Sequence, residues 1–129
     1  MHNSGPQSFT IKVSTTAPVD AESTTLFDST VAFGLGGFRH LPIKRISFAV
    51  NNSHAFTLIA KRSINGGTTW TTFSSIAVAG APSAGTITGP YDYLVDTFLD
   101  FQLIVTNGGT TQTTWTPEMH GHEDRVPGT

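Results

Sequence analysis

Apolar and polar residues alternate with a period of two through most of the chain, and this alternation limits its fold more than any other feature. In "SFTIKVST" (residues 8–15) it places Phe9, Ile11 and Val13 on one side of an extended strand and polar residues on the other. A period of two is typical of a strand with one buried face, whereas an amphipathic helix repeats every 3.6 residues or so. The helical period is almost absent, so the sequence predicts an all-β chain.

Four segments carry the alternation clearly and five carry it more weakly. The clear ones are residues 8–15, 44–50, 55–62 and 99–106, and the weaker ones are 25–33, 68–78, 84–88, 90–95 and 111–116. Turn-forming residues, among them those at 34–38, 51–54 and 79–85, separate the segments at intervals of about 8 to 12 residues. This spacing, without helices between the strands, indicates a single antiparallel β-sandwich or jelly roll.

The length of 129 residues fits one domain that buries its own core. Residues 8–116 carry the alternation and are expected to form the β-sandwich domain, whereas residues 1–7 and 117–129 are predicted to be a flexible arm and a polar C-terminal tail. The arm lacks the basic and apolar regions of a signal peptide, and no run reaches the roughly 18 to 20 apolar residues of a membrane span. We therefore expect a protein made in the cytoplasm, without a signal peptide and without membrane contact.

Composition excludes several classes of function. The chain has no cysteine, so it has no disulfide, thiolate zinc site or cysteine nucleophile. Seven Lys and Arg residues stand against nine Asp and Glu, and such a sparse, balanced charge argues against a nucleic-acid-binding surface. Hydroxyl residues take the place of charge, with 21 Thr and 11 Ser, and threonine favours half-exposed β-structure.

One phrase occurs twice, as "NGGTTWTTF" (residues 65–73) and as "NGGTTQTTW" (residues 107–115). Asn-Gly between two alternating runs is a strong hairpin signal, because both residues accept the positive φ that such turns need. We therefore predict that both copies are hairpin tips, each followed by a return strand. Trp70 and Trp115 would then cover an end of the sheet.

The first copy belongs to a longer pattern, "SINGGTTW" (residues 63–70), which resembles the Asp-box S-x-D-x-G-x-T-W with Asn65 in the place of the aspartate. The Asp-box is found on hairpins of sialidase-like propellers and of many phage and adhesive β-proteins. The resemblance implies a structural turn with Trp70 packed beneath it, and sugar contact through Trp70 is the alternative. A propeller does not fit, since four or more four-stranded blades need a longer chain.

Histidines and carboxylates supply the candidate catalytic and metal sites. His120 and His122 in "MHGHED" could bind a metal with Glu123 or Asp124, although a polar tail is the simpler interpretation. We therefore expect no metal site there. A hydrolase centred on His40 or His54 would need a carboxylate within hydrogen-bond reach of the imidazole ring.

A second candidate is the acidic run "YDYLVDTFLD", in which Asp92, Asp96 and Asp100 could share one face. Such a face could bind calcium, or it could be a solvated acidic stripe that protects a strand edge. The sequence contains no nucleophile elbow, P-loop or dinucleotide fingerprint. We expect the protein not to be an enzyme and to use no cofactor.

Five of the seven basic residues fall between positions 39 and 62, at Arg39, Lys44, Arg45, Lys61 and Arg62. If the strands at 43–50 and 55–62 pair as a hairpin across "NNSH", Lys44 and Arg45 come close to Lys61 and Arg62 at one end of a sheet. Such a cluster could bind an acidic partner or another copy of the chain. Ordinary solvation of strand ends is the alternative. The expected partner contacts are these five residues together with Trp70 and Trp115.

In its Thr- and Gly-rich, Cys-free pattern of strands and turns, the whole chain resembles capsid decoration (cement) proteins and other small virion proteins of tailed bacteriophages. The resemblance rests on "FGLGGFRHLPIKRISFAVNN", "SINGGTTWTTF" and "PYDYLVDTFLDFQLIVTNGGTTQTTW", and it covers most of residues 8–116. It implies a β-sandwich that binds the outside of an assembled capsid, often as a homotrimer, and reinforces contacts between capsomers. The implied partners are the major capsid protein and further copies of the chain, with no nucleic acid and no membrane.

A glycan-binding module of a tail fibre or adhesin is the alternative function. It would use exposed aromatic side chains as stacking platforms for sugars. The candidates for this role are Trp70, Tyr91, Tyr93 and Trp115.

Overall fold

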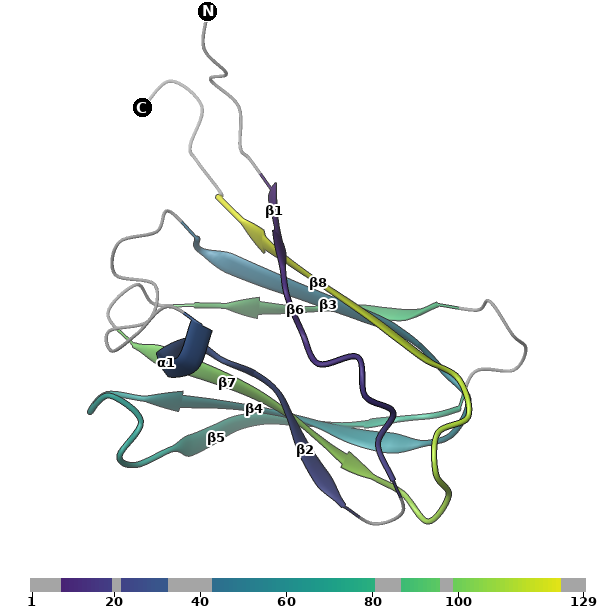
Figure 1. Ribbon diagram of the computed structural model, residues 1–129. Coiled ribbons are helices and arrows are strands. Elements are labelled where there is room, and N and C mark those ends of the chain that lie inside the picture. Colours follow the sequence, from purple (N-terminus) through teal and green to yellow (C-terminus); the bar gives the residue numbers. More distant parts are fainter. Residues whose placement is uncertain (1–7, 20–21, 33–42, 81–86, 96–98, 124–129) are drawn as a thin grey trace, which may run out of the picture.

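The computed structural model describes residues 8–19, 22–32, 43–80, 87–95 and 99–123, which form eight strands and one short helix (Figure 1). The strands are β1 (Ser8–Ile11), β2 (Ser23–Asp28), β3 (Arg45–Asn52), β4 (Phe56–Ser63), β5 (Thr71–Val78), β6 (Thr88–Leu94), β7 (Asp100–Asn107) and β8 (Trp115–His122). The helix α1 (Ser29–Ala32) has four residues, and no described helix is long and apolar enough to cross a membrane. The all-β prediction is confirmed.

Two antiparallel sheets make the domain, sheet A with the order β1-β8-β3-β6 and sheet B with the order β2-β7-β4-β5. Pairing is nested, since β4 pairs with β5, β3 with β6, β2 with β7 and β1 with β8. Among the described strands, β4 and β5 are the only consecutive pair within one sheet, so every other connection crosses between sheets. Eight strands arranged in this way form a jelly roll, one of the two architectures that the spacing predicts.

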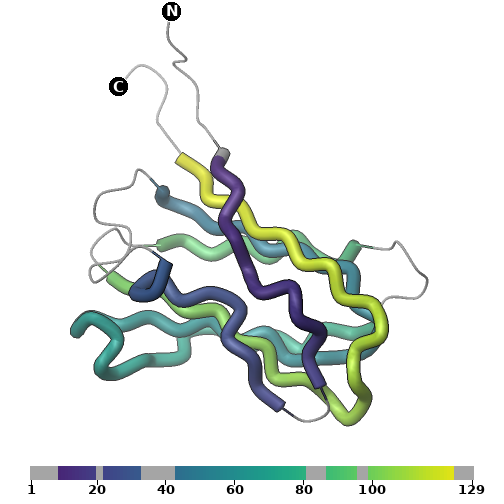
Figure 2. Tube along the Cα trace, viewed as in Figure 1, coloured from purple at the N-terminus to yellow at the C-terminus, as the bar shows by residue number. Residues whose placement is uncertain are grey.

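The core lies between the two sheets, which face each other as two layers in Figure 2. The alternating residues of β3 (Ile46, Phe48 and Val50) point inward from sheet A and are almost fully buried. Leu58 on β4 and Leu103 on β7 meet them from sheet B and have no exposed surface. Burying each such side chain contributes about 1.5 to 3 kcal/mol, and the two-residue period predicts which side chains these are.

The first copy of the repeated phrase is a hairpin tip, as predicted. It lies between β4 and β5, and Gly66 and Gly67 adopt positive φ angles of 70° and 91°. The buried Ser63 hydroxyl accepts hydrogen bonds from the Gly67 amide at 2.9 Å and the Asn65 amide at 3.3 Å. Asn65 Oδ1 accepts from the Ser63 hydroxyl at 2.7 Å and from the Thr69 amide at 2.9 Å. The side chains of Ser63 and Asn65 therefore fix the conformation of the turn through hydrogen bonds.

The second copy is not a hairpin tip, so that prediction is wrong. Residues 107–115 connect β7 in sheet B to β8 in sheet A. Gly108 and Gly109 do not adopt the positive φ that the first copy uses. The same Asn-Gly-Gly sequence therefore forms part of a connection between the two sheets, because the side chains that follow it hydrogen-bond to other parts of the chain than in the first copy.

Two predicted boundaries also need correction. Residues 117–122 belong to β8 and pair with β3, and residues 119–122 also pair with β1, so the polar tail does not begin at Pro117. Gly121 hides the alternation there, because it occupies an inward position without a side chain. A Cβ atom on Gly121 would lie 3.0 Å from Ile43 Cδ1 and 3.1 Å from Ile11 Cδ1, so those two side chains fill its place.

The remaining differences concern weaker segments. The predicted strand at 25–33 ends at Asp28 and gives way to α1, where the Asp28 carboxylate accepts hydrogen bonds from the Thr30 amide and hydroxyl. The two predicted strands at 84–88 and 90–95 are one strand, β6. Residues 84–86 lie outside the described part of the chain.

Buried side-chain amides join four of the sheet crossings at one end of the sandwich, at the lower right of Figure 1. Gln112, between β7 and β8, donates from Nε2 to the His54 carbonyl at 2.7 Å and to Asn107 Oδ1 at 2.8 Å. Its Oε1 accepts a hydrogen bond from the His54 backbone amide at 2.9 Å, and the backbone amide of Gln112 donates to the Pro18 carbonyl. These contacts tie the β7–β8 crossing to the β3–β4 and β1–β2 crossings.

Asn52 brings in the fourth crossing, between β5 and β6. Its Nδ2 donates to the Ala79 carbonyl at 3.1 Å, and its Oδ1 accepts from the Thr88 hydroxyl at 3.0 Å. Asn107 donates from its backbone amide to the Glu22 carbonyl, which closes the β1–β2 side. Asn52, Asn107 and Gln112 are 0%, 4% and 3% exposed, so we call them the buried amide network.

Replacing Gln112 with Ala is expected to lower the free energy of unfolding by about 3 kcal/mol. The His54 amide and the buried Asn107 Oδ1 lose their Gln112 partner, and the His54 carbonyl keeps only the Asn52 side chain as a donor. Urea unfolding followed by the fluorescence of buried Trp115 measures the loss. Gln102→Ala is the matched control, since Gln102 donates one hydrogen bond to Asp28 on the outer face of sheet B. Similar losses in the two variants would contradict a special role for Gln112.

Candidate functional site

The predicted basic cluster does not form, because β3 and β4 do not pair as a hairpin. The short connection between them crosses from sheet A to sheet B, so Lys44 and Arg45 lie on one sheet and Lys61 and Arg62 on the other. The buried amide network explains this crossing, since it holds Asn52 and His54 against the β7–β8 connection. Arg39 lies outside the described residues.

Arg45 and Lys44 mark the start of β3. Arg45 Nη1 lies 3.4 Å from Asp92 Oδ1 on β6 and 3.2 Å from the Ser47 hydroxyl, and Ser47 also donates to Asp92. Lys44 is exposed, and its backbone bonds to His122 and Val95. Arg45 is thus part of a surface network on sheet A, and Lys44 keeps its ammonium group in solvent.

Arg62 caps an aromatic cluster at the end of the sandwich opposite the buried amide network. Its guanidinium carbon lies 5.3 Å from the centroid of the Phe73 ring, which is a cation–π contact. Phe73, Tyr93 and Phe101 pack with centroid distances of 5.8 to 6.1 Å beneath it. The structure shows no ion pair of Arg62 within the described residues.

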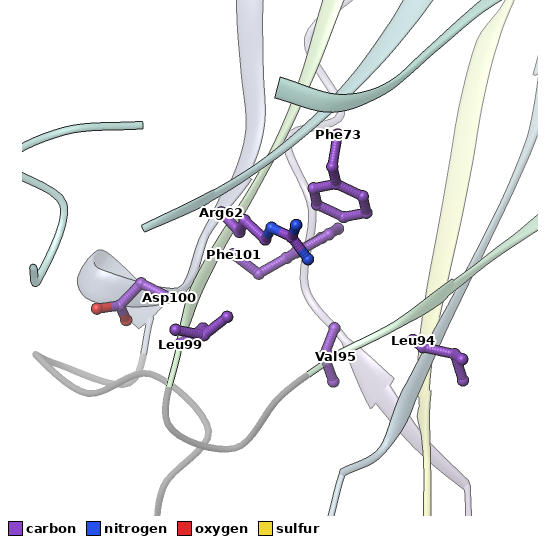
Figure 3. Close-up of a pocket in the computed structure, with 7 residues that line it drawn as sticks. All are labelled: Arg62, Phe73, Leu94, Val95, Leu99, Asp100 and Phe101. Carbon is purple, nitrogen blue, oxygen red and sulfur yellow. The ribbon is translucent and has the colours of Figure 1, made fainter. Parts of the chain in front are cut away.

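A pocket of about 290 Å³ opens beside this cluster (Figure 3). It is lined by Arg62, Phe73, Leu94, Val95, Leu99, Asp100 and Phe101. The Asp100 carboxylate points away from Arg62 in Figure 3, because Ser29 Oγ on α1 donates to it at 2.9 Å. Among the described residues, the pocket offers apolar walls, the Arg62 guanidinium and an Asp100 carboxylate that is turned away from it.

Three of the most exposed large apolar side chains lie at the same end of the sandwich. Ile64 in the β4–β5 turn is 85% exposed, Val31 in α1 is 84% exposed and Leu94 at the end of β6 is 80% exposed. α1 and the turn are neighbours, since a Cβ atom on Gly67 would lie 3.3 Å from Thr30 Cγ2. We call Val31, Arg62, Ile64 and Leu94 the exposed end.

The two tryptophans have different roles. Trp70 is half-buried and packs over the turn, with its Cζ2 atom 3.3 Å from the place of a Cβ on Gly67, as the Asp-box resemblance implies. Trp115 is 9% exposed and makes an edge contact with Phe56 at a centroid distance of 5.3 Å. Trp115 is therefore a core residue, and its prediction as a surface contact is wrong.

The same burial weakens the glycan-binding alternative. Tyr93 is 5% exposed and lies inside the aromatic cluster, so Tyr93 and Trp115 offer no stacking surface. Tyr91 is half-buried on β6 and packs against the core. Two of the four aromatic side chains expected to stack on sugars, Tyr93 and Trp115, are therefore buried.

The candidate histidines take part in structural contacts. His54 Nδ1 lies 2.9 Å from Ser53 Oγ, and that hydroxyl also accepts from the amides of Thr113 and Thr114 at 2.8 and 3.1 Å. These hydrogen bonds join the β3–β4 connection to residues 113 and 114 before β8. His40 lies outside the described residues.

The metal candidates are also placed by the sheets. His120 lies on β8 with its Nε2 3.8 Å from Glu118 Oε1, and within the described ranges no three His, Asp or Glu side chains are arranged to hold a metal ion. Asp92 lies on sheet A and is half-exposed, whereas Asp100 lies on sheet B and is 2% exposed. Asp92 and Asp100 therefore do not form an acidic stripe, and Asp96 is outside the described residues.

Comparison with known proteins gives a likeness of fold. No family model and no curated protein sequence matches the chain. The solved structure of the PBSX exported protein XepA is 15% identical with a TM-score of 0.64, over 93% of this chain and 38% of that one. The structure of infectious bursal disease virus strain Gx is 15% identical with a TM-score of 0.39, over 91% of this chain and 32% of that one.

These values limit what the comparisons mean. At 15% identity the XepA likeness shows the fold alone, and the lower TM-score of the viral structure carries no argument. The chain spans less than two fifths of the length of either protein. A shared jelly roll leaves function to be argued from the surface of this chain.

Tyr93 gives the aromatic cluster a measurable pH dependence. Burial raises the pKa of Tyr93 to about 12, with the Ser74 side chain lowering it and Tyr91 raising it slightly. The folded state favours the neutral hydroxyl, so its contribution to stability is complete below the unfolded pKa of about 10 and is lost as the pH rises toward 12.

Tyr93→Phe is expected to reduce the loss of stability between about pH 8 and about pH 11, because it removes the group that titrates. Urea unfolding at the two pH values measures this difference. Tyr91→Phe is the control, since burial raises the pKa of Tyr91 as well but that residue is more exposed. An unchanged pH dependence in Tyr93→Phe would show that other groups cause the loss.

Proposed function

We propose that this chain is a structural protein of a phage virion that binds the outer surface of an assembled capsid and reinforces contacts between capsomers. The jelly roll supports this proposal, because viral capsid domains are among the proteins that use it. The fold likeness to XepA, a protein of the phage PBSX, supports it as well. Lectin and cupin domains share the jelly roll, so the fold needs a second argument.

The exposed end supplies that argument and is the observation that carries the proposal. Val31, Ile64 and Leu94 present apolar surface to solvent at the same end of the sandwich as Arg62, whose guanidinium has no ion pair with any described residue. Exposed apolar side chains gathered at one end of a domain together with a charged residue are typical of protein contact surfaces. We propose that this end contacts the major capsid protein, with Arg62 binding a carboxylate of the shell and the apolar side chains excluding water around that pair.

The polar chemistry of the described chain supports binding and not catalysis. Ser53, His54 and Gln112 are held in structural hydrogen bonds, and Asp100 is bound by Ser29. The exposed end therefore acts by contact, without a chemical step. Many copies on one shell turn weak individual contacts into strong overall binding.

Purified protein is expected to co-sediment with capsids from a phage in which the gene for this chain has been deleted. The double variant Arg62→Glu, Leu94→Asp should stay in the supernatant, because it reverses the charge and removes the apolar contact at the exposed end. Glu118→Lys, a charge reversal at an exposed residue in the middle of β8 on sheet A, is the control and should sediment like the wild type. Wild-type protein that does not sediment, together with virions that lack the chain, would refute the proposal.

A further inference from the structure

The two copies of the Asn-Gly-Gly sequence differ in the chemistry that is open to their asparagines. An Asn-Gly step can lose its side-chain amide, because the backbone nitrogen of the glycine can attack Cγ of the asparagine. Glycine permits this attack better than other residues, since it has no Cβ atom and its backbone adopts conformations that other residues avoid. The freedom of the glycine nitrogen, the contacts of the asparagine side chain and the access of water decide whether the step proceeds.

At Asn65 all three features favour the attack. The residue is exposed in the β4–β5 turn, and among the described residues neither the Gly66 nitrogen nor Asn65 Nδ2 has a hydrogen-bond partner. Asn65 Oδ1 accepts from the Ser63 hydroxyl at 2.7 Å and from the Thr69 amide at 2.9 Å. Such donors also stabilise the negative charge that develops on this oxygen during the attack. The nucleophile and the leaving group are therefore free, while the oxygen that takes up the charge is held by two donors.

At Asn107 the same groups are engaged. The side chain is buried, with 4% of the residue exposed. The Gly108 nitrogen donates to the Ala55 carbonyl at 3.2 Å, and Asn107 Nδ2 donates to the Thr110 carbonyl at 2.9 Å. Asn107 Oδ1 accepts from Gln112 Nε2 at 2.8 Å within the buried amide network. An attack there needs these hydrogen bonds to break, in a place that water reaches when the network opens.

We propose that Asn65 is a site of spontaneous deamidation in the folded protein and that Asn107 is protected from the same reaction. The Gly66 nitrogen loses its proton to hydroxide and forms a bond to Asn65 Cγ. The bond between Cγ and Nδ2 then breaks, Nδ2 leaves as ammonia with a proton taken from water, and a cyclic imide remains. Water that adds to Cγ opens the ring at the Gly66 nitrogen, which regains its proton, and leaves an aspartate. Water that adds to the backbone carbonyl carbon of Asn65 leaves iso-aspartate instead.

The turn suits an aspartate at this position. Both hydrogen bonds of the Asn65 side chain end on Oδ1, so a carboxylate, which only accepts, can keep both of them. The Asp-box pattern that "SINGGTTW" resembles has an aspartate in the same place. At Asn107, by contrast, an aspartate would lose the hydrogen bond to the Thr110 carbonyl and would bury a charge.

The reaction also changes the surface of the protein. Position 65 follows Ile64 of the exposed end, so the conversion adds one negative charge beside that surface. The inference does not depend on the proposed function, because it uses the turn alone.

Peptide mapping by mass spectrometry tests the proposal on the whole chain. The protein is incubated in mildly alkaline buffer, and the fraction of acid at positions 65 and 107 is followed with time, with aspartate and iso-aspartate counted together. In the folded protein Asn65 is expected to convert about tenfold faster than Asn107 or more, because the Asn107 site must first open. In concentrated urea the protection is removed, and the two nearly identical sequences should convert at similar rates.

Two results would overturn the proposal. One is conversion of Asn65 and Asn107 at equal rates in the folded protein. The other is an Asn65 that stays intact in the folded protein over several half-lives of its conversion in urea.

Two substitutions test whether each site accepts the product. Asn65→Asp is expected to unfold at the same urea concentration as the wild type or at a higher one, because the Ser63 and Thr69 donors keep their acceptor. Asn107→Asp is the matched variant and should unfold at a lower concentration, because it buries a carboxylate and leaves the Thr110 carbonyl without its donor. Greater destabilisation by Asn65→Asp than by Asn107→Asp would contradict this account of the turn.

Discussion

The hydrogen bonds of the Gln112 side chain are the interaction on which the rest of the structure depends. A jelly roll needs its chain to pass repeatedly between two sheets, and each passage leaves backbone groups without a ladder partner in a poorly hydrated place. Gln112, Asn52 and Asn107 satisfy those groups for four crossings at one end of the sandwich. The same contacts keep β3 and β4 in opposite sheets, which separates the basic residues on which a hairpin-based site would depend.

The two ends of the sandwich therefore differ in what they can do. At one end the side-chain amides of Asn52, Asn107 and Gln112 are buried and bind the connections between the sheets. At the other end the Asp-box-like turn and α1 expose Ile64 and Val31, and the guanidinium of Arg62 lies over the Phe73 ring.

Much of the fold follows from the period of two, because alternation reports which side of a strand is buried. It placed Phe48 and Leu103 in the core and identified the first Asn-Gly-Gly copy as a turn. The alternation does not show that the second copy is a crossing between sheets, because the two nine-residue sequences are nearly identical. The difference comes from the hydrogen bonds between Gln112 and His54, which are far apart in the chain. The alternation also lost β8 where Gly121 removes a side chain from the pattern.

The site was less predictable from the sequence than the fold. The clustering of Lys and Arg along the chain does not indicate which sheet each strand joins. The prediction that these residues form one basic cluster is therefore wrong. Trp115 is a core residue although the sequence predicts a surface aromatic, because the residues before it form a crossing between sheets and not a hairpin turn. One signal was present and informative: Leu58-Ile59 and Leu103-Ile104 are adjacent apolar pairs inside alternating strands, which marks strands with apolar residues on both faces.

Amide hydrogen exchange at the sheet crossings tests the central claim most directly. The backbone amides of His54 and Gln112 donate to Gln112 Oε1 and the Pro18 carbonyl inside the buried amide network. They are expected to exchange as slowly as the core amides of β7, through global unfolding. Exchange as fast as that of Thr68 in the solvent-facing turn would contradict the account, because the crossings would then open without the rest of the domain.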